Sequence, residues 1–146
     1  MKILTFARSR NRCLERFLSL SEEFFRYLSA ADQEDLDQRL LNFERTRDSI
    51  LRALDLFDRK LKEEGKILRR DSLGSPALQE LKIMLFKRDD LVHKILDVDL
   101  QIIGRIERIR DSIFSNLSQS RVAKNRIGRF KSGADEINGH EVDEKA

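Results

Sequence analysis

The fold of this chain is decided by residues 36–68, which read LDQRLLNFERTRDSILRALDLFDRKLKEEGKIL. Along this stretch, ten positions are spaced alternately four and three residues apart, and eight of them are apolar. An apolar repeat sustained over several heptads is typical of helices that pack as a coiled coil. The ten predicted core positions are Leu36, Leu40, Phe43, Arg47, Ile50, Leu54, Phe57, Leu61, Glu64 and Leu68.

Apolar residues at helical spacing also occur on both sides of this stretch, so the chain is predicted to hold three helices. We expect them at about residues 8–28, 33–68 and 76–130. Asp32 and Ser75 are the predicted caps of the second and third helices, because short polar side chains accept hydrogen bonds from the first free amides. The stripe of the first helix comprises Leu14, Phe17, Leu18, Phe24, Phe25 and Leu28. The stripe of the third comprises Leu78, Leu81, Leu85, Arg88, Val92, Ile95, Asp99, Ile102, Ile106, Ile109, Ile113, Asn116, Ser120, Ala123, Ile127 and Phe130.

The composition agrees with a protein made of long helices. The 146 residues include one Pro, six Gly and no Trp, with 40% apolar and 38% charged residues. So few helix breakers disfavour an all-β protein, which needs many turns. We predict an all-α fold, an elongated antiparallel three-helix bundle or coiled-coil hairpin with a long, overhanging C-terminal helix. Residues 1–131 would form the helical domain, and 132–146 a disordered acidic tail.

The turn between the second and third helices sets a register for the hairpin. When Leu68 pairs with Leu78 in antiparallel helices, paired residue numbers sum to about 146. Arg47 then falls opposite Asp99, and both are polar at positions that the heptad assigns to the core. We therefore predict a partly buried Arg47–Asp99 ion pair that fixes the register.

The same register leaves the end of the third helix without an internal partner. Gln33 would lie opposite Ile113, so that the last ~18 residues of the helix project past the second helix. An unpartnered apolar stripe usually marks an interaction surface. The predicted partner-binding residues, here called the C-terminal stripe, are Ile113, Phe114, Leu117, Ala123, Ile127 and Phe130.

Charge is distributed unevenly along the chain. The formal net charge is +3, of which residues 132–146 contribute −4 and residues 1–131 contribute +7. Residues 112–131 hold five basic residues and no acidic one. Such a stretch can attract phosphate, anionic lipid or an acidic partner. It can also simply complement the dipole of a helix C-terminus, and both interpretations stay open.

No arrangement typical of catalysis or metal binding is visible. Asp89, Asp90 and His93 form a single carboxylate–His spacing, whereas a di-iron bundle needs a second such helix. Cys13 is interpreted as a small buried hydrophobe rather than a reactive thiol. We expect no enzyme activity, metal, cofactor or small-molecule substrate.

The predicted location is the cytoplasm. The N-terminal run without charge before Arg8 is too short for a signal-peptide core, and no stretch approaches the ~20 apolar residues of a membrane span. A single cysteine excludes an intramolecular disulfide and fits a reducing compartment.

Four segments together resemble the flagellar export chaperones of the FliT/FlgN type. They are LSAADQEDL at 28–36, RDSI at 47–50, ILDVD at 95–99, and the basic segment SRVAKNRIGRF at 120–130. The last segment closes on Phe130, where Tyr is usual in that family. The resemblance covers about residues 10–131.

The resemblance implies a cytosolic chaperone that binds a flagellar type III export substrate and escorts it to the export machinery. The C-terminal helical region of that family commonly engages cargo or regulatory partners. The resemblance implies that the corresponding residues of this chain are those of the C-terminal stripe. Two alternatives stay open. One is a coiled-coil scaffold that homodimerises through this stripe, and the other, less favoured, is nucleic-acid binding by the basic segment. Only Phe130 could stack on a base within that segment.

Overall fold

A computed structural model describes residues 2–30, 34–67 and 74–135, with the backbone alone for residues 75 and 128–135. The regular elements within these ranges are all helices: α1 (Lys2–Ser29), α2 (Leu36–Ile67) and α3 (Ser75–Asp135). The predicted all-α fold class is confirmed.

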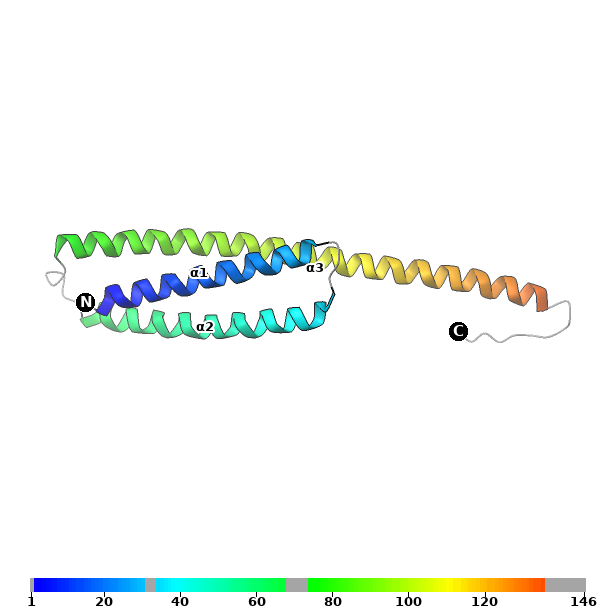
Figure 1. Cartoon of the computed structure of the whole chain (residues 1–146), viewed down its shortest axis with the longest axis horizontal. Helices are drawn as coiled ribbons and strands as arrows, with labels where there is room; N and C mark the ends of the chain where they lie inside the picture. Colours follow the sequence, from blue (N-terminus) through cyan, green and yellow to red (C-terminus); the bar gives the residue numbers. More distant parts are fainter. Residues whose placement is uncertain (1, 31–33, 68–73, 136–146) are drawn as a thin grey trace. The chain divides into compact units, whose positions relative to one another are not determined.

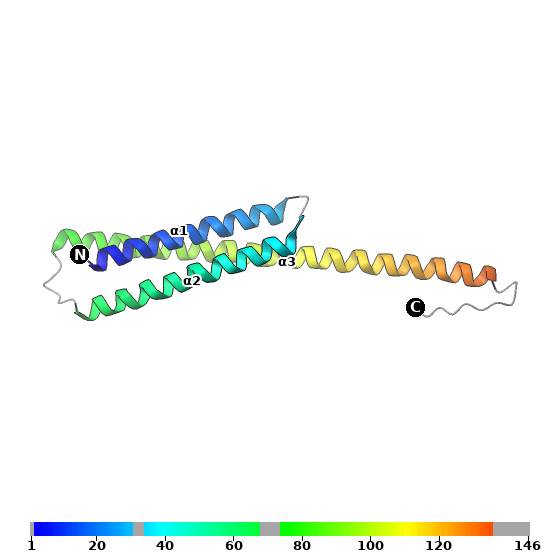
Figure 2. The same cartoon turned by 60° about the horizontal axis from the view of Figure 1, so that its bottom comes forward.

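The chain divides into two compact units, Met1–Arg105 and Ile106–Ala146. The first unit contains α1, α2 and the first part of α3, which lie side by side as a three-helix bundle (Figures 1 and 2). In this bundle α2 runs antiparallel to α1 and α3. The described part of the second unit is the rest of α3.

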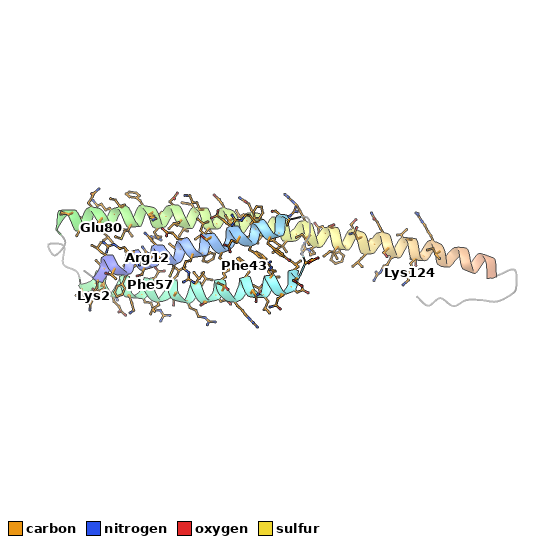
Figure 3. The ribbon with its side chains drawn as sticks, viewed as in Figure 1. Lys2, Arg12, Phe43, Phe57, Glu80 and Lys124 are labelled. Atoms are coloured by element: carbon orange, nitrogen blue, oxygen red, sulfur yellow. The ribbon has the colours of Figure 1, made fainter. Side chains whose placement is uncertain are left out.

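The heptad of α2 predicts its packed face correctly. All predicted core positions of α2 within the described residues are buried or half-buried, whereas Leu68 lies outside the described range. Ile50 joins Leu14, Phe17, Leu91 and Ile95 in one buried cluster, which takes residues from all three helices. Nearer the C-terminal end of α1, Phe24 stacks on Phe43 of α2 with ring centroids 4.3 Å apart. Phe43 is labelled in Figure 3.

Helix α1 begins at Lys2, six residues before the predicted start at residue 8. Its first turns are held by packing, because Ile3, Leu4 and Ala7 are buried against Met84. The heptad of α1 in fact continues backwards from Leu14 to Ile3. The sequence interpretation missed it because polar residues interrupt the pattern. The buried heptad positions are Ile3, Ala7, Arg10, Leu14, Phe17, Ser21, Phe24 and Leu28.

Polar contacts fix α1 along α3 within the bundle. The buried Asn11 side chain donates from Nδ2 to the main-chain oxygen of Met84 at 3.0 Å. At the far end of α1, Arg105 Nε donates to the main-chain oxygen of Leu28 at 3.0 Å. This carbonyl belongs to the last turn of α1, where main-chain acceptors have no partner within the helix. Two ion pairs between the helices, Arg8–Glu80 and Glu15–Lys87, accompany these hydrogen bonds.

The packed face of α3 differs from the predicted stripe. Leu78 and Leu85, predicted as core, are 42% and 39% exposed, whereas Met84 and Leu91, outside the stripe, are buried. The predicted stripe follows from the heptad of the third helix and its register with the second, and takes no account of where the first helix packs. Because α1 also packs on α3, the buried arc turns toward α1 and includes residues that a two-helix hairpin would leave in solvent.

Both interhelical boundaries differ from the predicted caps. Asp35 has a positive φ of 58° and its carbonyl accepts from the amide of Arg39 at 2.9 Å, so Asp35 immediately precedes α2. The predicted cap Asp32 lies outside the described residues. At the start of α3, the carbonyl of Gly74 accepts from the amide of Leu78 at 3.0 Å. Gly74 therefore takes the cap position that was predicted for Ser75, which is the first residue of the helix.

Helix α3 ends at Asp135 rather than at residue 130. Residues 132–135, predicted as part of the disordered tail, continue the helix. Extending an existing helix adds a hydrogen bond for each residue fixed and needs no new nucleus, so even a polar segment can prolong it. The remaining tail, residues 136–146, lies outside the described residues.

Candidate partner-binding surface

The predicted ion pair lies inside the bundle. Arg47 Nη2 of α2 is 3.4 Å from Asp99 Oδ2 of α3, as the register predicts. The two side chains are 41% and 21% exposed, so the pair is only partly removed from water. The guanidinium carbon of Arg47 also lies 5.7 Å from the ring centroid of Phe17 of α1. Arg47 therefore links all three helices, although the hairpin register named only two of them.

The C-terminal stripe is exposed wherever its side chains are described. Ile113, Phe114, Leu117 and Ile127 are 51%, 65%, 59% and 58% exposed, and Ala123 is also exposed. The side chain of Phe130 lies outside the described residues, as does Gln33, the predicted neighbour of Ile113. Large apolar side chains with this much exposure retain most of their contact surface for a partner.

The helical geometry divides the C-terminal stripe between two faces. Ile113 and Leu117 are four residues apart and share one face, with Ile127 further along the same side. Phe114 and Ala123 are nine residues apart, about two and a half turns at 3.6 residues per turn, so they face opposite directions. One partner helix could not cover both. Ala123 lies four residues before Ile127 and belongs to its side of the helix, so Phe114 is the member that lies furthest from Ile113 around the helix.

Two residues extend this face toward the N-terminal end of the second unit. Ile106 and Ile109 are half-buried and lie seven and four residues before Ile113. With Leu117 they make an i, i+3, i+7, i+11 series, the pattern by which an amphipathic helix presents one apolar face. They belong to the heptad of the third helix, so the signal was present in the sequence. The overhang argument excluded them because it began at Ile113. This set (Ile106, Ile109, Ile113 and Leu117) is called the isoleucine face below.

Basic side chains follow the isoleucine face along α3. Arg121, Lys124 and Arg126 are exposed, and Lys124 is labelled on the C-terminal part of α3 in Figure 3. No acidic residue occurs between Ser112 and Ile127. An apolar face that continues into positive charge is complementary to a segment that is both apolar and acidic.

The residues considered for metal chemistry lie on an open helix surface. Asp89, Asp90 and His93 are exposed on α3, and Asp90 pairs with Lys94 at 2.9 Å. Within the described ranges, no three His, Cys, Asp or Glu side chains come together as a metal site would require. Cys13 is half-buried and packs against the cluster around Phe17.

Comparisons of the chain with models of protein families, with curated proteins and with solved structures found no match. Across the described helices, none contains an apolar stretch long enough to span a membrane. The interpretation of the surface therefore depends on its own geometry and charge.

Proposed function

We propose that this chain is a non-catalytic binding protein that holds an amphipathic segment of another protein against the C-terminal part of α3. The isoleucine face would cover apolar side chains of the partner, and the basic residues that follow would meet its acidic ones. The observation that carries the proposal is the exposure of four large apolar side chains in the second unit, Ile113, Phe114, Leu117 and Ile127.

The resemblance to flagellar export chaperones of the FliT/FlgN type supplies the identity of the partner in this proposal. The chain would bind a flagellar type III export substrate in the cytoplasm and escort it to the export machinery. An export chaperone must keep an aggregation-prone segment bound without folding around it permanently. An exposed amphipathic helix suits this task, because it can bury a partner helix without rearranging its own bundle.

The test uses the whole chain and C-terminal fragments of flagellar filament-cap, hook–filament junction and flagellin proteins. Light scattering should show a complex with one of these fragments, and calorimetry should give its affinity. The double substitution Leu117→Ala with Ile127→Ala should weaken binding about tenfold or more, since two apolar contacts lose most of their area. The matched control is Leu56→Ala, an exposed leucine on α2 that should leave the affinity unchanged.

Two outcomes would contradict the proposal. If no flagellar fragment binds, the flagellar part fails. If the unmodified chain is a dimer that the double substitution converts to a monomer, the exposed face serves self-association, and the chain is a homodimeric scaffold instead.

A further inference from the structure

A lysine interrupts the apolar side of α3 in the second unit. Lys124 follows Leu117 by seven residues, almost two helical turns, and precedes Ile127 by three. These three side chains therefore lie on the side of α3 that carries the isoleucine face. All three are exposed, Leu117 and Ile127 by 59% and 58%. A partner that covers both apolar side chains must also cover the lysine between them.

The other exposed basic residues of this segment occupy different positions around the helix. Arg126 follows Leu117 by nine residues, about two and a half turns, so it lies on the opposite side of α3. Arg121 follows Leu117 by four residues and borders the isoleucine face. Lys124 is thus the cation that lies between two apolar members of the surface, and Arg126 provides a matched comparison.

No carboxylate of α3 lies close to Lys124. The nearest acidic residues on either side are Asp111 and Asp135, thirteen and eleven residues away. At 1.5 Å per residue these separations correspond to about 20 and 16 Å along the helix, well beyond the screening length of ~8 Å at physiological salt. Among the described residues, the ion pairs leave Lys124 without a partner.

A partner packed on this surface changes the free energy of the lysine charge. In the free chain the ammonium group is hydrated, but a helix that contacts Leu117 and Ile127 displaces water from the region between them. Removing a cation from water without a partner is unfavourable, whereas a carboxylate placed beside it offsets the lost hydration. A lysine at this position therefore favours partners with an acidic residue at the matching level, and disfavours those with only apolar residues there.

We propose that Lys124 selects partner helices by the position of one carboxylate. The inference rests on the proposed function, because it concerns the segment held against α3. Apolar residues of the partner pack on the isoleucine face. A carboxylate about seven residues beyond them accepts from Nζ of Lys124, and a further apolar residue covers Ile127. The partner is thus an amphipathic helix with one acidic residue inside its apolar face, about one heptad beyond its main apolar cluster.

The experiment uses the full chain and two synthetic helical peptides of the same composition. Both have a series of leucines at three- and four-residue spacing over about eleven residues, and one further leucine about ten residues beyond the series at each end. The in-register peptide has a glutamate seven residues beyond the series at each end, on the leucine face, so that it can bind in either direction. The out-of-register peptide has these glutamates nine residues beyond the series, on its opposite side.

Fluorescence anisotropy at low salt should show the in-register peptide binding about threefold tighter or more, where an exposed ion pair sets the lower limit. Equal affinities of the two peptides would overturn the inference and leave the proposed function standing. If neither peptide binds, the surface does not hold amphipathic helices, and the inference fails together with the proposed function.

Two matched variants locate the effect. Lys124→Gln should lower the affinity for the in-register peptide to that for the out-of-register peptide. Arg126→Gln removes the same charge from the opposite side of α3 and should keep the difference between the peptides. Both residues are exposed, so neither change should alter the helicity measured by circular dichroism.

Three results with these variants would overturn the inference. The first is an undiminished difference between the peptides in Lys124→Gln, and the second is an equal loss of that difference in Arg126→Gln. The third is a dimer of the unmodified chain that Lys124→Gln dissociates, because the surface would then be covered by a second copy of this chain.

Discussion

Apolar residues at helical spacing occur in both units of the chain, but those compared here are buried in the first unit and exposed in the second. In the bundle, heptad positions such as Leu14 and Ile95 are 6% exposed, because neighbouring helices cover them. In the second unit, Ile113 continues the predicted heptad of α3 but is 51% exposed, and Leu117 beside it is 59% exposed. The comparison teaches that a heptad specifies a face that needs a partner. Whether that partner belongs to the same chain is decided by which helices are available to pack.

The largest expected effect lies in the core of the bundle. Leu14→Ala removes a side chain that packs with Phe17, Ile50 and Ile95, and should lower the free energy of unfolding by about 2–5 kcal/mol. Urea denaturation followed by circular dichroism measures it. Surface substitutions change the free energy of unfolding by less than about 1 kcal/mol. A loss that small would show that Leu14 contributes less to stability than its burial indicates.

An intermediate effect is expected at the ion pair between α2 and α3. A double-mutant cycle with Arg47→Leu and Asp99→Leu should give a coupling of about 0.5–1 kcal/mol, because both side chains keep contact with water. This is less than the ~3 kcal/mol or more expected for a deeply buried pair. A coupling of that larger size would contradict the partial exposure of Arg47.

Gly104 lies in α3 next to the boundary between the two units, and replacing it should change the stability of the helix. A Cβ built on this residue meets nothing within 4 Å, so Gly104→Ala should stabilise α3 by about 0.5–1 kcal/mol through reduced backbone entropy. Thermal unfolding measures the gain. A lower melting temperature would show that the chain needs glycine here to bend, as a helix of this length can at its weakest residue.

The smallest effect on stability is expected in the second unit. Leu117→Ala with Ile127→Ala should change the free energy of unfolding by less than about 0.5 kcal/mol, since both side chains are nearly 60% exposed. Urea denaturation under the conditions used for Leu14→Ala gives a direct comparison. A loss of about 2 kcal/mol or more would show that these residues are covered in the folded protein.

The structure corrects the sequence interpretation chiefly where the first helix is involved. The α2 heptad and the Arg47–Asp99 register follow from the spacing of residues within one hairpin, and spacing is visible in a sequence. Burial of Met84 and Leu91, and exposure of Leu78, depend on where α1 packs, which no pattern within α3 records. The early start of α1 was missed because Arg10 interrupts its apolar heptad before Leu14, although Arg10 is buried.

The candidate surface was only partly predictable for a similar reason. The exposure of Phe114 and Leu117 agrees with the hairpin register, because the prediction leaves these positions without a partner helix. The opposite directions of Phe114 and Ala123 follow from helical periodicity once α3 is known to be continuous. The unpaired buried nitrogens of Arg10, Arg47 and Arg88 had no signature in the sequence, since their burial depends on how all three helices pack.

The sequence by itself determined the helical class, the three segments, and one inter-helix register, because heptad spacing and scarce helix breakers are local properties. Tertiary structure alone decided which face of α3 is buried and where donors are left unpaired. The physical reason is that burial depends on the positions of all three helices at once. The side of each helix that is buried is the side on which the other two helices lie. A linear pattern gives the width of an apolar face, but only packing gives its direction.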